Sequence, residues 1–69
     1  MAAMTIELNG EAKEVPEGAT VADLVKLLDL ASGRFAVEVN KAIVPRSQLA
    51  ERSLAAGDHV EIIGFVGGG

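Results

Sequence analysis

The sequence predicts an α+β domain in which one main helix packs across a mixed β-sheet. Apolar residues alternate at period two near the beginning, in the middle and near the end of the chain, a pattern typical of strands. Between the first two of these stretches, residues 20–28 place their apolar side chains at helical spacing. A chain of 69 residues forms one small domain, so these elements must share a single core.

The first predicted element is a β-hairpin in the stretch "TIELNGEAKEV". Ile6 and Leu8 alternate with polar residues and precede Asn9-Gly10, the pair that best tolerates the positive φ angles of a tight turn. The second strand is placed at about Ala12 to Val15, and its weak pattern leaves the register open.

An amphipathic helix of about three turns is predicted in "TVADLVKLLDL". Thr20 is placed to cap its first turn, and Asp23 stands three residues later, as in a capping box. We expect the helix to end before "ASGR", where Gly33 can adopt the left-handed conformation. The predicted buried face consists of Val21, Leu24, Leu27 and Leu28.

The second half of the chain predicts a short hairpin, an irregular crossing and a last strand. The strand "FAVEVN" turns at Asn40-Lys41 into "AIV", which stops at Pro45. The following residues offer Leu49 and Leu54 as apolar anchors and a short helical turn, and Gly57-Asp58 reverses the chain into "HVEIIGFV". This order of elements is typical of a β-grasp fold, whose last strand lies beside the first.

We expect one β-grasp domain over residues 1–69. Met1 to Ala3 are interpreted as an N-terminal extension, and Gly67 to Gly69 as a flexible C-terminal tail, because glycine loses the most backbone freedom on ordering.

The composition excludes several classes of function. The chain has no cysteine, so disulfides and thiolate chemistry are excluded, and a formal net charge of −4 with two aromatic residues argues against nucleic-acid binding. No stretch reaches membrane-spanning length and "MAAM" is unlike a signal peptide, so no membrane association and a cytoplasmic location are expected.

The sequence offers no catalytic or metal-binding constellation. His59 stands alone and is interpreted as a surface histidine, and the three serines have no evident base. The region of Asn40, Lys41, Pro45 and Arg46 is either a small polar site or, as turn chemistry favours, a structural feature. We therefore expect a protein that is not an enzyme and holds no metal and no bound cofactor.

The last strand contains an unexpected pair of apolar residues. If Val60 and Ile62 face the core, then Ile63 and Phe65 point outward and form a docking surface for a partner protein. The alternative is a bulge at Gly64 that returns Phe65 to the core.

The terminal glycines can function as a substrate. Without Cβ atoms, Gly67 and Gly68 can thread a narrow channel and deliver the carboxylate of Gly69 to the active site of another protein. A carboxylate resists nucleophiles, so that protein must first activate it, and transfer to the phosphate of ATP is the usual route.

The whole pattern resembles the ubiquitin-like sulfur carriers, most closely the thiamine-biosynthesis sulfur carrier family. The matching stretches are "TIELNGE", "TVADLVKLL", "VEVNKAIVPRSQ", "GDHVEII" and the closing "FVGGG". The resemblance implies that an adenylating enzyme related to ubiquitin-activating enzymes uses ATP to activate Gly69. It also implies that sulfur from a cysteine desulfurase, passed on as a persulfide, converts Gly69 to a thiocarboxylate, and that a thiazole synthase uses this sulfur for the thiazole ring of thiamine.

Two other functions stay open on the sequence. One is the same carrier chemistry in another pathway, such as molybdopterin synthesis. The other is a β-grasp module that binds a partner without carrying sulfur and would tolerate loss of the glycines.

Overall fold

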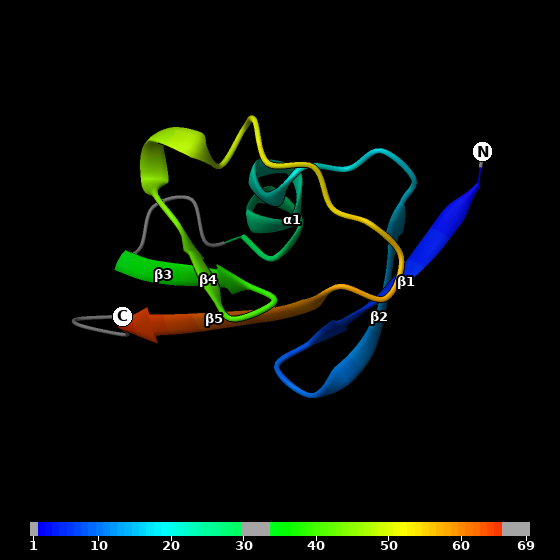
Figure 1. Cartoon of the computed structure of the whole chain (residues 1–69), viewed down its shortest axis with the longest axis horizontal. Helices are drawn as coiled ribbons and strands as arrows, with labels where there is room; N and C mark the ends of the chain where they lie inside the picture. Colours follow the sequence, from blue (N-terminus) through cyan, green and yellow to red (C-terminus); the bar gives the residue numbers. More distant parts are fainter. Residues whose placement is uncertain (1, 30–33, 66–69) are drawn as a thin grey trace.

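The computed structural model describes residues 2–29 and 34–65 and contains one five-stranded sheet with a helix on one face (Figure 1). The strand order is β2-β1-β5-β3-β4. The central pair β1 and β5 is parallel, whereas the remaining pairs are antiparallel, so the sheet is mixed as predicted. The elements are β1 (Ala3–Leu8), β2 (Glu11–Pro16), α1 (Val21–Leu27), β3 (Arg34–Val39), β4 (Ala42–Val44), a 3₁₀ turn (Arg46–Gln48) and β5 (His59–Phe65).

Both predicted hairpin turns are confirmed by their backbone angles. Asn9 and Gly10 have φ of 50° and 86°, and Asn40 and Lys41 have φ of 51° and 71°. Positive φ at both central residues gives a turn whose twist matches that of the flanking strands. The first turn fixes the register that the sequence left open, with Leu8 opposite Glu11 and Ala3 opposite Pro16. Ala3, which the sequence analysis assigned to an extension, thus belongs to β1.

The helix begins as predicted and ends earlier than predicted. Helix α1 has 7 residues, about two turns, and not the expected three. Asp29 adopts a φ of 60° directly after the Leu28 cap and ends the helix there, since Asp tolerates the left-handed conformation through its short polar side chain. The predicted stop at Gly33 lies outside the described residues.

The capping box at the start of α1 is complete. The backbone N–H of Asp23 donates to Thr20 Oγ1 at 3.2 Å, and the backbone N–H of Thr20 donates to Asp23 Oδ2 at 3.0 Å. The hydrogen bond from the Thr20 backbone N–H, and to a smaller extent one from the Thr20 hydroxyl, lowers the pKa of the Asp23 carboxyl below its ordinary value.

Replacement of Thr20 by alanine is expected to lower the free energy of unfolding by about 1 kcal/mol, because it removes the acceptor for the Asp23 N–H.

A folded-state pKa below the unfolded value means that the Asp23 carboxylate stabilises the fold at neutral pH. This contribution is lost as the pH falls through the lowered pKa. Urea unfolding of the wild type and of Asp23→Asn at several pH values measures this contribution. The difference in free energy of unfolding between the two proteins should be largest above about pH 4 and should shrink on acidification. A gap that persists unchanged at the lowest pH would contradict the role of the charge.

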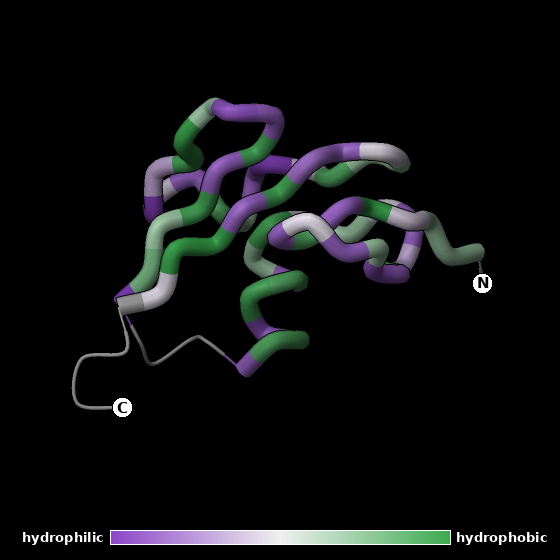
Figure 2. The backbone as a smooth tube through the Cα atoms, turned by 90° about the horizontal axis from the view of Figure 1, so that it is seen from below, coloured by the Kyte–Doolittle hydropathy of each residue, from purple (hydrophilic) through white to green (hydrophobic). Residues whose placement is uncertain are grey.

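The core lies between the sheet and α1, and its buried residues in the described part of the chain are aliphatic apart from Met4. Val37, Val39 and Val60 supply the buried side of the central strands, and each is 1% exposed. Phe35 and Ile62 are half-buried at the edge of this core. Figure 2 shows hydrophilic and hydrophobic residues alternating along the strands, the pattern of a sheet with one covered and one open face.

The crossing segment between β4 and β5 covers the beginning of α1. Leu54 is buried and Leu49 half-buried, as predicted for the two anchors. Backbone hydrogen bonds fix the segment to the helix entry, from Val21 N to Arg52 O and from Leu54 N to Ala19 O. None of the helices in the described part of the chain has the length and apolar character needed to cross a membrane.

Candidate functional site

The face of the sheet opposite α1 is open and carries the residues that the sequence singled out for docking. Here "open face" denotes the outward side chains of β3, β4 and β5. Ile63 is 50% exposed on it, one residue after the half-buried Ile62. The predicted outward orientation of Ile63 is therefore confirmed, and its role in docking stays a prediction.

The alternative of a bulge at Gly64 is wrong. Strands β3 and β5 pair without interruption, with Ala36 opposite Ile63, Phe35 opposite Gly64 and Arg34 opposite Phe65. A bulge would place two residues of one strand opposite one of the other. A Cβ atom built at Gly64 would meet no atom within 4 Å, so close packing does not require glycine at this position.

The strand β5 leads directly to the predicted sulfur-carrying tail. Its last residue, Phe65, is described only by its backbone, and the outward orientation predicted for its side chain lies outside the described part. Gly67, Gly68 and Gly69 also lie outside the described residues, so their predicted roles in threading and sulfur transfer stay predictions.

Sequence reasoning missed Ile43, the most exposed large apolar residue among those described, at 69%. It lies opposite Glu38 in the β3–β4 pair, and Glu38 lies opposite Glu61 in the β3–β5 pair. Residues opposite each other point to the same side, and so do residues two apart on a strand, so Ile43 shares the open face with Ile63. No sequence signal singled out Ile43, because β4 has only three residues, and its outward position follows from the burial of its neighbour Val44 in the structure.

Hydrogen bonds from polar side chains hold the first half of β5 in place. Asn40 Nδ2 donates to Asp58 Oδ1 at 3.1 Å, and Asn40 Oδ1 accepts from the backbone N–H of His59 at 2.9 Å. Asn9 Oδ1 accepts from the backbone N–H of Ile62 at 2.9 Å, where β1 has already ended. The structure thus gives Asn40 a structural function, in agreement with the interpretation as turn chemistry. Sequence reasoning placed Asp58 in a turn and missed that it is buried, at 9% exposure.

The titratable groups form no metal-binding cluster within the described residues. His59 is 66% exposed by its side chain and its Nδ1 lies 3.5 Å from Glu7 Oε2, as expected for a surface histidine. No group of three or more His, Cys, Asp or Glu side chains in residues 2–29 and 34–65 could hold a metal ion. Arg46 lies over the ring of Phe35, 4.7 Å from its centre, and so contributes to packing.

These features define a β-grasp protein with an open sheet face and with a glycine-rich sequence after its last strand. The model of the ThiS family matches residues 3–69, so the chain belongs to the ThiS family. The predicted resemblance to the sulfur carriers of thiamine biosynthesis is thereby confirmed. The family match also begins at Ala3, in agreement with the first paired residue of β1.

Individual relatives agree with this assignment. The chain is 33% identical to the sulfur carrier protein ThiS of Escherichia coli K12, covering 96% of this chain and 100% of that protein. The crystal structure of the thiamine biosynthesis protein ThiS from Geobacter metallireducens superposes with a TM-score of 0.80 at 30% identity, over 96% of this chain and 100% of that one. The β-grasp fold is thereby confirmed.

Similarity extends to a longer protein as well. The chain is 39% identical over 66 residues to a thiazole synthase of Paramagnetospirillum magneticum, which covers 96% of this chain. It spans only 20% of the length of that relative, and the same share of a thiazole synthase from Magnetococcus marinus.

Proposed function

We propose that this chain carries sulfur as a thiocarboxylate on Gly69 and donates it for the thiazole ring of thiamine. The observation that carries the proposal is the match to the ThiS family over residues 3–69, which includes the closing glycines. The sulfur carrier protein ThiS of Escherichia coli K12, which this chain matches over that protein's full length, supports the same function.

The first step is activation of the carboxylate by a partner. A Gly69 oxygen attacks the α-phosphorus of ATP, pyrophosphate leaves, and an acyl-adenylate forms. No cluster that could hold a metal ion lies in the described part of the chain, and in our proposal the partner supplies the groups that stabilise this reaction. An adenylating enzyme related to ubiquitin-activating enzymes is the partner that the family resemblance implies. The carrier is then a co-substrate and not itself the enzyme.

The second step exchanges oxygen for sulfur. The terminal sulfur of a persulfide, formed by a cysteine desulfurase, attacks the acyl carbon of Gly69, and AMP leaves with its oxygen. A second thiol then attacks the donor-side sulfur of the resulting S–S bond. The thiocarboxylate on Gly69 is released, and the attacking thiol and the sulfur of the donor cysteine form a disulfide. The three closing glycines suit this role because a tail without Cβ atoms can enter a narrow active site.

The acceptor in our proposal is a thiazole synthase. A segment similar to this chain forms part of the thiazole synthases of two organisms, and such joining of carrier and synthase supports their interaction. Action in the cytoplasm is part of the same proposal, because ATP and the persulfide must both reach the carrier.

The mass of the intact protein tests the proposal. The chain is incubated with ATP, its candidate adenylating enzyme and a persulfide source, and a parallel sample lacks ATP. We expect a gain equal to the replacement of one oxygen by sulfur, only when ATP is present. No gain with an adenylating enzyme that is active on another carrier would overturn the proposal and favour the binding module that carries no sulfur.

Replacement of Ile63 by glutamate is expected to weaken binding to the adenylating enzyme by about tenfold or more, since a charge in an apolar contact is poorly compensated. Its effect on folding should be small because Ile63 is 50% exposed. Titration calorimetry and thermal unfolding of the same samples measure the two effects. A lower melting temperature with unchanged affinity would assign Ile63 to stability alone.

A further inference from the structure

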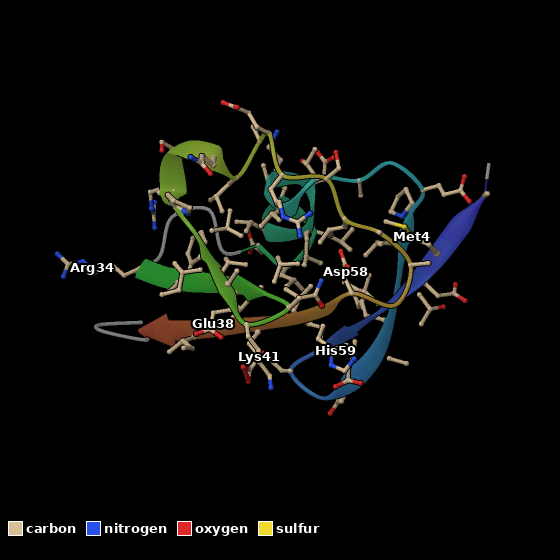
Figure 3. All side chains as sticks on the ribbon, viewed as in Figure 1. Met4, Arg34, Glu38, Lys41, Asp58 and His59 are labelled. Carbon is tan, nitrogen blue, oxygen red and sulfur yellow. The ribbon has the colours of Figure 1, made fainter. Side chains whose placement is uncertain are left out.

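Two carboxylates on the open face are placed directly opposite each other. Glu38 of β3 and Glu61 of β5 form a cross-strand pair, and both lie on the side of the sheet away from α1, as Figure 3 shows for Glu38. Side chains in such a pair have Cβ atoms about 5 Å apart, and like charges at this distance destabilise a sheet. The isolated domain therefore tolerates an unfavourable interaction at this position.

A lysine and a histidine lie near this pair without forming an ion pair with it in the described part of the chain. Lys41 and His59 line the same hollow of about 390 Å³ as the two carboxylates, and Glu7 adds a third acidic group. Within residues 2–29 and 34–65, neither Glu38 nor Glu61 forms an ion pair, and the His59 ring lies against Glu7 instead. The hollow is thus bordered by two carboxylates with oxygens free to accept hydrogen bonds.

Exposed apolar side chains flank the carboxylate pair. Ile43 lies opposite Glu38 on one side, and Ile63 follows Glu61 by two residues towards the end of β5. A partner that covers this face must combine apolar contact with a cation. Arginine meets both demands, because its aliphatic part packs on apolar surface while its planar guanidinium donates up to five hydrogen bonds.

We propose that Glu38 and Glu61 together bind an arginine side chain of the adenylating enzyme, beside the apolar contacts of Ile43 and Ile63. This inference rests on the proposed function, because docking on this face would hold β5, and hence the tail that follows it, towards the active site. Charge complementarity favours such a partner, since the carrier has a formal net charge of −4. Lysine, a point charge with three donors, would bridge the two carboxylates less well.

Stability measurements test the first half of the inference without any partner. Glu61→Gln removes one charge and keeps the side-chain shape, so it is expected to raise the melting temperature by about 2–4 °C at low salt. Glu51→Gln is the matched control, an exposed glutamate of the crossing segment whose replacement should leave the melting temperature unchanged. An unchanged or lowered melting temperature of Glu61→Gln would overturn the claim that Glu38 and Glu61 repel each other in the folded domain.

Binding measurements test the second half. The probe is the adenylating enzyme that gives the sulfur-dependent mass gain with the wild-type chain. Glu38→Gln and Glu61→Gln are each expected to lower the affinity about tenfold and to reduce its dependence on salt, whereas Glu51→Gln binds as wild type. Wild-type affinity in both variants would overturn the inference while leaving the carrier function intact. Failure of the mass gain itself would overturn the carrier function first, and this inference with it.

An enzyme variant identifies the cation. Charge reversal to Glu38→Arg should abolish binding to the wild-type enzyme, and an arginine→glutamate change on the enzyme surface should restore part of it. If no surface arginine of the enzyme restores binding to Glu38→Arg, an arginine is not the group that is bound.

Discussion

Deletion of Gly69 is expected to lower the rate of thiocarboxylate formation by at least about 100-fold and to leave the stability of the domain unchanged. The carboxylate of the shortened chain would end one residue away from the reacting phosphorus, and misplacement on this scale costs at least that factor. The fold should not respond, because every buried core residue of the described chain lies between Met4 and Val60. Intact mass after the sulfur-transfer reaction and thermal unfolding measure the two effects.

A variant that keeps the length of the tail shows whether the deletion acts through the position of the terminal carboxylate or through the loss of the glycine itself. Gly69→Ala retains a terminal carboxylate at the same distance from β5 and adds only a methyl group. We expect it to lose less activity than the deletion, and to lose some because the added Cβ must fit the channel. Equal yields for the wild type and the deletion would contradict a sulfur carrier and leave a protein whose function depends on its sheet face alone.

The sequence was sufficient for the order of elements because each turn had its own chemical signal. Asn9-Gly10 and Asn40-Lys41 adopt the positive φ angles that such residues tolerate, and both predicted strand pairs follow. The parallel contact between β1 and β5 joins residues 52 apart in the chain, Glu7 with His59. No local pattern specifies such a contact, and only the β-grasp interpretation of the whole order predicted it.

The docking surface was predictable only in part. Strict alternation in β5 identified Ile63, whereas the three-residue strand β4 is too short for alternation to single out Ile43. The pair of Glu38 and Glu61 depends on the register between β3 and β5, which the sequence does not give. For the same reason the environment of Asp58 was missed, since its partner Asn40 is 18 residues away.

The prediction of the buried face of α1 was wrong for one residue, Leu27, which is 56% exposed. Successive helical residues are rotated by about 100°, so Leu27 lies about 120° from Val21, whereas Val25 lies only about 40° from it. Val25 is buried and takes the place on the face that the prediction gave to Leu27. The short helix then needs only Val21, Leu24 and Val25 to cover the sheet.

This difference leads to a prediction with an internal control. Leu24→Ala is expected to lower the free energy of unfolding by about 3 kcal/mol, because Leu24 is 1% exposed and its truncation leaves a cavity between helix and sheet. Leu27→Ala removes the same atoms from the same helix and should cost less than about 1 kcal/mol, because they are largely in water already. Both substitutions introduce alanine, which has a higher helix propensity than leucine, so propensity does not account for a loss of stability in either variant.

Urea unfolding followed by circular dichroism measures both variants. A domain of this size has a total stability of only about 5 kcal/mol, so Leu24→Ala should be close to unfolding at 37 °C while Leu27→Ala remains folded. Sulfur-transfer activity should follow the folded fraction in both variants, because neither residue lies on the open face. Equal losses of stability would mean that Leu27 is covered in solution and that the helix packs as the sequence first indicated. A selective loss of sulfur transfer in folded Leu27→Ala would instead assign the exposed side of the helix to partner binding.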